Sequence, residues 1–140
     1  MLGQIAAEFP GKVRVVYKDF PLAFHEGALP AAEAARCAGE HGRFWEYHDL
    51  LFVAQPAFSK SDLVTYAGRL GLPREGFAAC IESGQHREAV KADVAEGRAA
   101  GVRGTPTFFI NGRRLVGAQP IDAFREAVQA ALRVGGDKRP

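Results

Sequence analysis

The stretch Val102–Gly112, VRGTPTFFING, constrains the fold of this chain more than any other segment. In an X-Pro bond the cis form costs only about 0.5–1 kcal/mol more than trans, so Thr105-Pro106 can fix a sharp turn. Proline lacks a backbone N–H and has a fixed φ, so Pro106 can begin a strand but not lie inside one. Thr107–Ile110 is apolar and β-prone, and Asn111-Gly112 is a strong hairpin signal. The sequence therefore predicts a cis-proline turn leading into a β-hairpin.

Length and composition narrow the class of protein. A chain of 140 residues indicates one domain with a single core. Its hydrophobic fraction of 47% and charged fraction of 24% are those of an ordinary globular protein. A net charge of +2 with scattered arginines gives no reason to expect nucleic acid as a partner. No apolar run reaches membrane-spanning length, and no signal peptide is visible in this sequence.

Turn residues and hydrophobic periodicity divide the chain into further elements. Pro10-Gly11 ends a first helix, and the β-branched run Val13–Lys18 is predicted to be a buried strand. Arg113–Val116 is predicted to be the second strand of the hairpin. The remaining helices are predicted at Ala31–His41, Arg43–Ala54, from Ser59 or Ser61 to Leu70, from Pro73 onward, at His86–Ala100, and from Pro120 to Gly135-Gly136. Strands towards both ends with helices between them indicate an α/β sheet that carries a helical insertion.

Three segments, together with TPTFFING, resemble the DsbA-like thiol–disulfide oxidoreductases of the thioredoxin fold. Arg14–Leu22 is similar to the strand and loop that follow the active-site helix in that family. Ala34–Phe52 is similar to the start of the family's helical insertion, and Ala89–Gly112 to its last helix entering the cis-proline loop. The resemblance implies one thioredoxin-like α/β domain over residues 1–140, with a DsbA-like helical insertion at about residues 28–101.

The sequence departs from this family at its beginning. In the family, a central strand leads into Cys-x-x-Cys at a helix N-terminus, where the helix dipole lowers the thiol pKa. The second cysteine then resolves the mixed disulfide. This sequence begins inside that helix, so we expect an N-terminally truncated fold with strand and motif before Met1. The family activity, protein disulfide exchange, is therefore not expected of this chain, and no catalytic residue is assigned.

The resemblance assigns substrate binding to Gly104, Thr105 and Pro106. In the family, the backbone just before the proline pairs with an extended peptide, a form of strand addition. The implied partners are extended or unfolded polypeptides and an unidentified redox partner, and no cofactor is implied. A redox-inactive module that binds peptides at the same loop is the alternative. The missing strand would expose sheet edges and so favour a domain-swapped homodimer. Family members are often exported from the cytoplasm. The sequence does not determine the compartment of this chain, and the cytoplasm is one of the alternatives.

The two cysteines, Cys37 and Cys80, lie in predicted helices and lack the spacing of a redox motif or zinc knuckle. They can form a structural disulfide if their Cα atoms lie within about 7 Å. Two buried free thiols are the alternative. Cys37, His41 and His48 recur at helical offsets, but Gly42 is expected to break the helix between the histidines. Zinc usually needs four ligands, or three and a water, so no metal site is predicted.

Two polar residues near the first strand have two interpretations each. One interpretation of Asp19 is a buried acid that tunes thiol chemistry. The other is the start of an Asx-turn, and the position of Asp19 before Phe20-Pro21 favours the turn. His25 lines a substrate groove, or is a solvated loop histidine, which is the more common situation.

Overall fold

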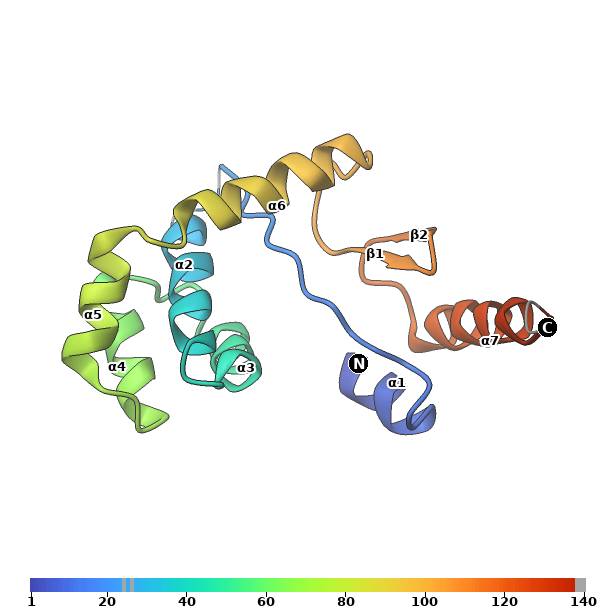
Figure 1. Cartoon of the computed structure of the whole chain (residues 1–140), viewed down its shortest axis with the longest axis horizontal. Coiled ribbons are helices and arrows are strands. Elements are labelled where there is room, and N and C mark those ends of the chain that lie inside the picture. Colours follow the sequence, from blue (N-terminus) through green and yellow to red (C-terminus); the bar gives the residue numbers. More distant parts are fainter. Residues whose placement is uncertain (24, 26, 138–140) are drawn as a thin grey trace. The chain divides into compact units, whose positions relative to one another are not determined.

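The computed structural model describes residues 1–23, 25 and 27–137. It contains two compact units, one formed by Met1–Lys18 with Gly101–Pro140 and the other by Asp19–Ala100. The latter is called the helical unit below, and the former the hairpin unit. The elements are α1 (Leu2–Glu8), α2 (Ala28–Gly39), α3 (Phe44–Ala54), α4 (Lys60–Arg69), α5 (Arg74–Ser83), α6 (Arg87–Ala99), β1 (Thr107–Ile110), β2 (Arg113–Val116) and α7 (Ile121–Asp137) (Figure 1). No helix of the described residues is both long and apolar enough to cross a membrane.

The helical unit packs its helices around α2, which α3 and α5 both contact (Figure 1). Alanines dominate the buried positions of α2 and let the neighbouring helices approach closely. Tyr47, Leu63 and Phe77 are fully buried at the centre of this core. The Tyr47 hydroxyl donates a 2.8 Å hydrogen bond to the backbone carbonyl of Leu63. Burial raises the pKa of this phenol, so it stays protonated and keeps its role as a donor.

Side-chain and glycine caps set the ends of these helices. Of the two predicted serines, Ser59 is the N-cap of α4 and forms a capping box with Asp62. Pro73 is the N-cap of α5, and Gly84 ends that helix with a left-handed φ of 64°. The predicted end of the last helix at Gly135-Gly136 is wrong, because α7 continues to Asp137. Glycine costs only about 1 kcal/mol in a helix interior, which an otherwise favourable helix tolerates.

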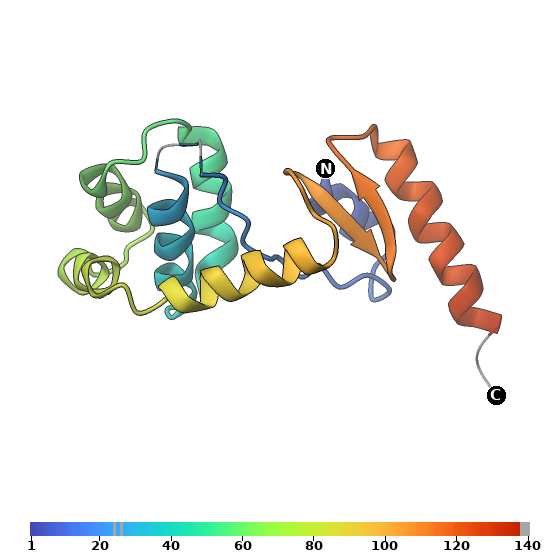
Figure 2. The same cartoon turned by 90° about the horizontal axis from the view of Figure 1, so that it is seen from above.

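The hairpin unit contains an antiparallel pair in which Phe108 faces Leu115 across β1 and β2. The turn residues Asn111 and Gly112 have φ values of 49° and 87°, as the predicted tight hairpin turn requires. Helix α7 contacts β1 and lies beside the hairpin (Figure 2). A small core forms there, in which the rings of Phe108 and Phe124 meet edge to face with centroids 4.7 Å apart.

The predicted buried strand at Val13–Lys18 is wrong. The structure assigns no strand to this segment, and the side chains of Val16 and Tyr17 are 59% and 41% exposed. A strand needs a neighbour to pair with its backbone N–H and C=O groups. The sheet of the described residues consists of β1 and β2 alone. Among the described residues, Val13–Lys18 therefore has no neighbouring strand to pair with, and its β-branched side chains alone do not make it a strand.

Candidate functional site

The loop before β1 holds the three predicted substrate-binding residues next to one another. Thr105 and Pro106 are exposed and Gly104 is half-buried. The peptide bond between Thr105 and Pro106 is cis. The Thr107 hydroxyl donates to the Gly104 carbonyl at 2.7 Å, and the Gly117 N–H donates to the Pro106 carbonyl at 2.8 Å. These two hydrogen bonds fix the loop to the hairpin.

The backbone of this loop is available to a partner. Among the described residues, neither the N–H nor the C=O of Thr105 has a hydrogen-bond partner. A Cβ atom placed on Gly104 would meet no atom within 4 Å, so there is open space beside this residue. Strand β1 follows this loop directly. Within the described residues, only one of its two edges is paired, with β2. Unpaired backbone of this kind can pair with an extended peptide.

A charged cluster of Asp19, Arg36 and Asp93 lies in the helical unit. The Arg36 guanidinium donates to Asp19 Oδ2 at 2.6 Å through Nε and to Asp93 Oδ2 at 2.8 Å through Nη2. The backbone N–H of Asp19 also donates to Asp93 Oδ2, at 2.8 Å. Burial raises the pKa of the Asp19 carboxyl, and the adjacent Arg36 opposes this shift. The Asx-turn interpretation of Asp19 is therefore wrong: this carboxylate is a buried acid that ties its segment to α2.

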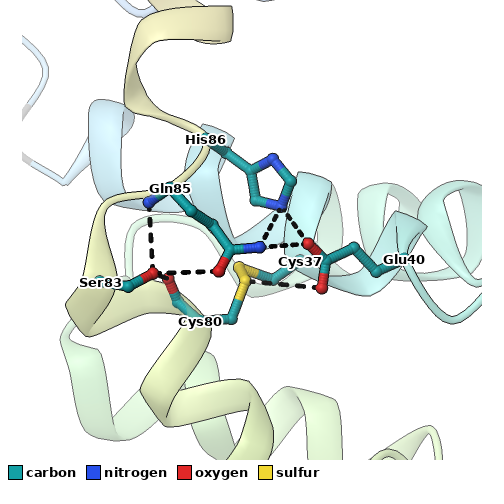
Figure 3. Close-up of a disulfide and its surroundings, with 6 residues drawn as sticks. All are labelled: Cys37, Glu40, Cys80, Ser83, Gln85 and His86. Carbon is teal, nitrogen blue, oxygen red and sulfur yellow. Dashed lines mark hydrogen bonds and ion pairs between the residues drawn. A yellow bond between two sulfur atoms is a disulfide. The ribbon is translucent and has the colours of Figure 1, made fainter.

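A second polar cluster surrounds the two cysteines, which form a disulfide with an S–S distance of 2.08 Å and a Cα–Cα distance of 6.1 Å (Figure 3). Cys37 lies in the last turn of α2, and Cys80 lies in α5. Glu40, the C-cap of α2, lies close to His86 and to Cys80. Its Oε1 lies 2.7 Å from His86 Nε2, and its Oε2 lies 4.0 Å from Cys80 Sγ. Gln85 donates a further hydrogen bond to Glu40 Oε1.

The metal-ligating side chains that the fold brings together are not those that recur at helical offsets in the sequence. The ligand atoms of Cys37, Cys80 and His86 all lie within 4.8 Å of one another. Among the described residues, neither His41 nor His48 joins this group. His48 instead packs in α3 against the aromatic rings of Phe44, Trp45 and Phe52.

The helical unit also contains a hollow of about 540 Å³. Among the described residues, it is lined mainly by apolar side chains of the segment before α2, of the first turn of α2 and of α6, and the polar lining residues are His25, Lys91 and Arg98. His25 is exposed and lies at this hollow, which belongs to the helical unit and not to the loop of Thr105.

Comparison with known proteins identifies the family. Residues 1–130 match the thioredoxin family. The chain belongs to the thioredoxin family. Two relatives are the Na(+)/H(+) antiporter NhaA 3 of Salinispora tropica, 40% identical over 134 residues, and the Na(+)/H(+) antiporter NhaA of Herminiimonas arsenicoxydans, 35% identical over 129 residues. These matches cover 91% and 92% of this chain but 21% and 20% of the relatives, so the chain spans about a fifth of the curated relatives' length.

A solved structure supports the fold of this thioredoxin-family chain. The crystal structure of a thioredoxin-like oxidoreductase from Silicibacter pomeroyi DSS-3 superposes with a TM-score of 0.81 at 23% sequence identity. The superposition covers 94% of this chain and 75% of that one. The predicted thioredoxin-like fold is thereby confirmed, as a mainly helical structure with a small sheet. The DsbA-like subfamily and the roles of the loop residues stay predictions.

Proposed function

We propose that this chain is the substrate-binding part of a DsbA-like thiol–disulfide oxidoreductase domain, with a helical insertion at about residues 28–101. Its substrates are extended or unfolded polypeptides. The observation that carries the proposal is the unpaired backbone of Thr105 beside the open space at Gly104, in a chain of the thioredoxin family. Sodium–proton exchange belongs to relatives of which this chain matches about a fifth, and we do not extend it to this chain.

The chain does not catalyse disulfide exchange by itself in this proposal. Its 140 residues contain no Cys-x-x-Cys. A nucleophilic thiolate is stabilised at a helix N-terminus, whereas Cys37 lies at the opposite end of α2, where the dipole disfavours negative charge. Cys80 lies inside α5, and both sulfurs are already bonded to each other. The helical cysteines therefore do not replace the missing pair.

Peptide binding tests the role of the loop. A fluorescently labelled, reduced and alkylated unfolded polypeptide should bind the oxidised chain in an anisotropy titration. Gly104→Val should weaken binding at least about tenfold, because its side chain occupies the space that a peptide backbone would need. Gly3→Val is the matched control, since a Cβ on Gly3 also meets no atom within 4 Å. No binding by the unsubstituted chain, or equal loss in both variants, would overturn the proposal.

An insulin-reduction assay with a dithiol as the electron source tests the absence of catalysis. We expect the rate of the dithiol alone. A higher rate that disappears in a Cys37→Ser variant would show that the helical cysteines are catalytic after all.

The second candidate is a redox-inactive module that binds extended peptides at the same loop. The open edge of β1 within the described residues favours it as well, because strand addition there needs no thiol chemistry. The coding sequence before Met1 separates the two candidates: an in-frame strand with Cys-x-x-Cys supports the oxidoreductase, and an in-frame stop codon supports the module. A domain-swapped homodimer would close the same edge, and a monomer by light scattering would count against it.

A further inference from the structure

We propose that reduction of the Cys37–Cys80 disulfide creates a zinc site in the helical unit, with Cys37, Cys80, His86 and Glu40 as ligands (Figure 3). The ligand atoms of the first three lie within 4.8 Å of one another. Glu40 completes the set, since its carboxylate lies 2.7 Å from His86 Nε2 and 4.0 Å from Cys80 Sγ. Two thiolates, an imidazole and a carboxylate are ligand types that zinc binds in tetrahedral sites.

The distances suit a tetrahedral ion once the sulfurs are free to separate. Zinc lies about 2.3 Å from sulfur and about 2.0–2.2 Å from nitrogen or oxygen, so tetrahedral ligands lie on the order of 3.5 Å apart. His86 Nε2 and Glu40 Oε1 are now 2.7 Å apart, so they must move apart by roughly 1 Å or somewhat less to reach this spacing. The Cα atoms of the cysteines, 6.1 Å apart, can stay where they are while their side chains rotate around an ion.

The framework holds these ligands from three sides. Cys37 and Glu40 come from the end of α2, Cys80 from α5, and His86 from the N-cap of α6. Cys37 is buried, while the side chains of His86 and Glu40 are 21% and 42% exposed, so an ion can enter from the side of the carboxylate. Gln85 donates to Glu40 and would orient the carboxylate as an outer-shell partner.

The oxidation state controls this site. In the disulfide, each sulfur is bonded to the other and carries no negative charge, so it is a poor zinc ligand. An external dithiol supplies two electrons and two protons to the disulfide: the dithiol becomes a disulfide, and Cys37 and Cys80 become thiols. Zinc then displaces the two thiol protons to solvent and binds both thiolates. His86 and Glu40 fill the two remaining positions. An external disulfide that accepts two electrons from the thiolates, and two protons from solvent, would become a dithiol, restore the Cys37–Cys80 bond and release the ion.

Cobalt(II) titration tests the site on the full chain. The chain is reduced with excess dithiol, freed of reductant without oxygen, and compared with the oxidised chain. We expect the reduced chain to develop thiolate-to-cobalt charge-transfer and tetrahedral d–d bands that saturate at one ion per chain and disappear on adding zinc. The oxidised chain should show neither band. Equal binding by both forms, or no tetrahedral bands in the reduced form, would overturn the proposal.

Two histidine variants make the test specific. His86→Ala should weaken cobalt binding at least about tenfold. His41→Ala should leave it unchanged, because His41 is an exposed histidine beside Glu40 that lies outside the ligand group. Equal loss in the two variants would show unspecific binding and overturn the proposal.

Circular dichroism keeps the test valid if reduction unfolds the helices. In that case zinc should restore the helical signal in the unsubstituted chain and in His41→Ala, but not in His86→Ala. A signal that zinc does not restore would contradict the site. Peptide binding is measured on the oxidised chain, so failure of the zinc site and failure of the proposed function are separate results.

Discussion

The two units of this chain differ in the size of their cores and in how each core is closed. The helical unit closes its core with its own helices, pairs Arg36 with two buried carboxylates and carries the disulfide. The hairpin unit has a much smaller core, a strand paired on one edge among the described residues, and the unpaired backbone of Thr105. Groups that a fold leaves unsatisfied are the ones that a partner can satisfy. We therefore propose that the helical unit supplies most of the stability and that the hairpin unit, through the loop of Thr105, supplies recognition.

The largest expected effect comes from the centre of the helical core. Phe77 is 1% exposed and its ring lies 5.3 Å from that of Tyr47. Phe77→Ala should lower the free energy of unfolding by about 3–5 kcal/mol, through lost burial and the cavity left behind. Phe109→Ala is the control in the hairpin unit, where Phe109 is 46% exposed, and it should change stability by about 0.5 kcal/mol or less. Urea unfolding measures both, and equal losses would break the comparison.

Removing the disulfide should have the next largest effect. It links residues 43 positions apart, for which chain entropy gives an upper value of about 4 kcal/mol, so a Cys37→Ala/Cys80→Ala variant should lose about 2–4 kcal/mol. Measurements are made with a chelator present, so that no metal replaces the bond. Adding a dithiol should destabilise the unsubstituted chain by a similar amount and leave the variant unchanged. A dithiol effect that persists in the variant would mean that the disulfide is not its cause.

Arg36→Ala should lower the free energy of unfolding somewhat less than removal of the disulfide does. Removing one partner of a fully buried pair costs about 3–5 kcal/mol, and the 28% exposure of the Arg36 side chain reduces this to about 2–3 kcal/mol. The exposed Arg133→Ala on α7 is the control, and it should be nearly neutral.

The same variant carries a pH signature. Burial raises the pKa of Asp19, so the folded state binds this proton more tightly than the unfolded chain, and stability from this group rises as pH falls. Loss of Arg36 removes the charge that opposes this shift. The destabilisation should therefore be smaller at about pH 5 than at about pH 7 in urea titrations. An equal loss at both values would show that Asp19 does not respond to Arg36.

The smallest effect is expected on the surface of the hairpin unit. Arg125 on α7 binds the Glu8 carboxylate of α1 through two hydrogen bonds of 2.7 and 2.6 Å, and these lower the pKa of Glu8. The stabilisation is complete above the ordinary glutamate value of 4.5 and is lost as pH falls through the lowered pKa. Glu8→Gln should lower the thermal midpoint slightly at neutral pH and have no effect in acid. A difference that persists in acid would exclude this ion pair as its source.

Local sequence chemistry predicts most of the elements. The Ser59 cap and the Asn111-Gly112 turn each depend on a few neighbouring residues, and each occupies its expected place. The strand prediction for Val13–Lys18 is wrong because strand formation depends on a neighbouring strand, which the composition of a segment does not reveal.

The clusters of the helical unit could not be predicted for a related reason. Arg36 and Asp93 lie 57 positions apart, and His86 and Glu40 lie 46 apart. Only the packing of α2 against α5 and α6 brings such residues together. The loop of Gly104, Thr105 and Pro106 is contiguous, so the sequence alone indicates it.

Amide hydrogen exchange with and without an unfolded polypeptide tests the central claim most directly, because it reports on both units in one experiment. If recognition belongs to the hairpin unit, the bound polypeptide should slow exchange at Thr105 and in β1 and leave α2 to α5 unchanged. Slower exchange confined to the helical unit, or no change at Thr105, would contradict the assignment of substrate binding to this loop.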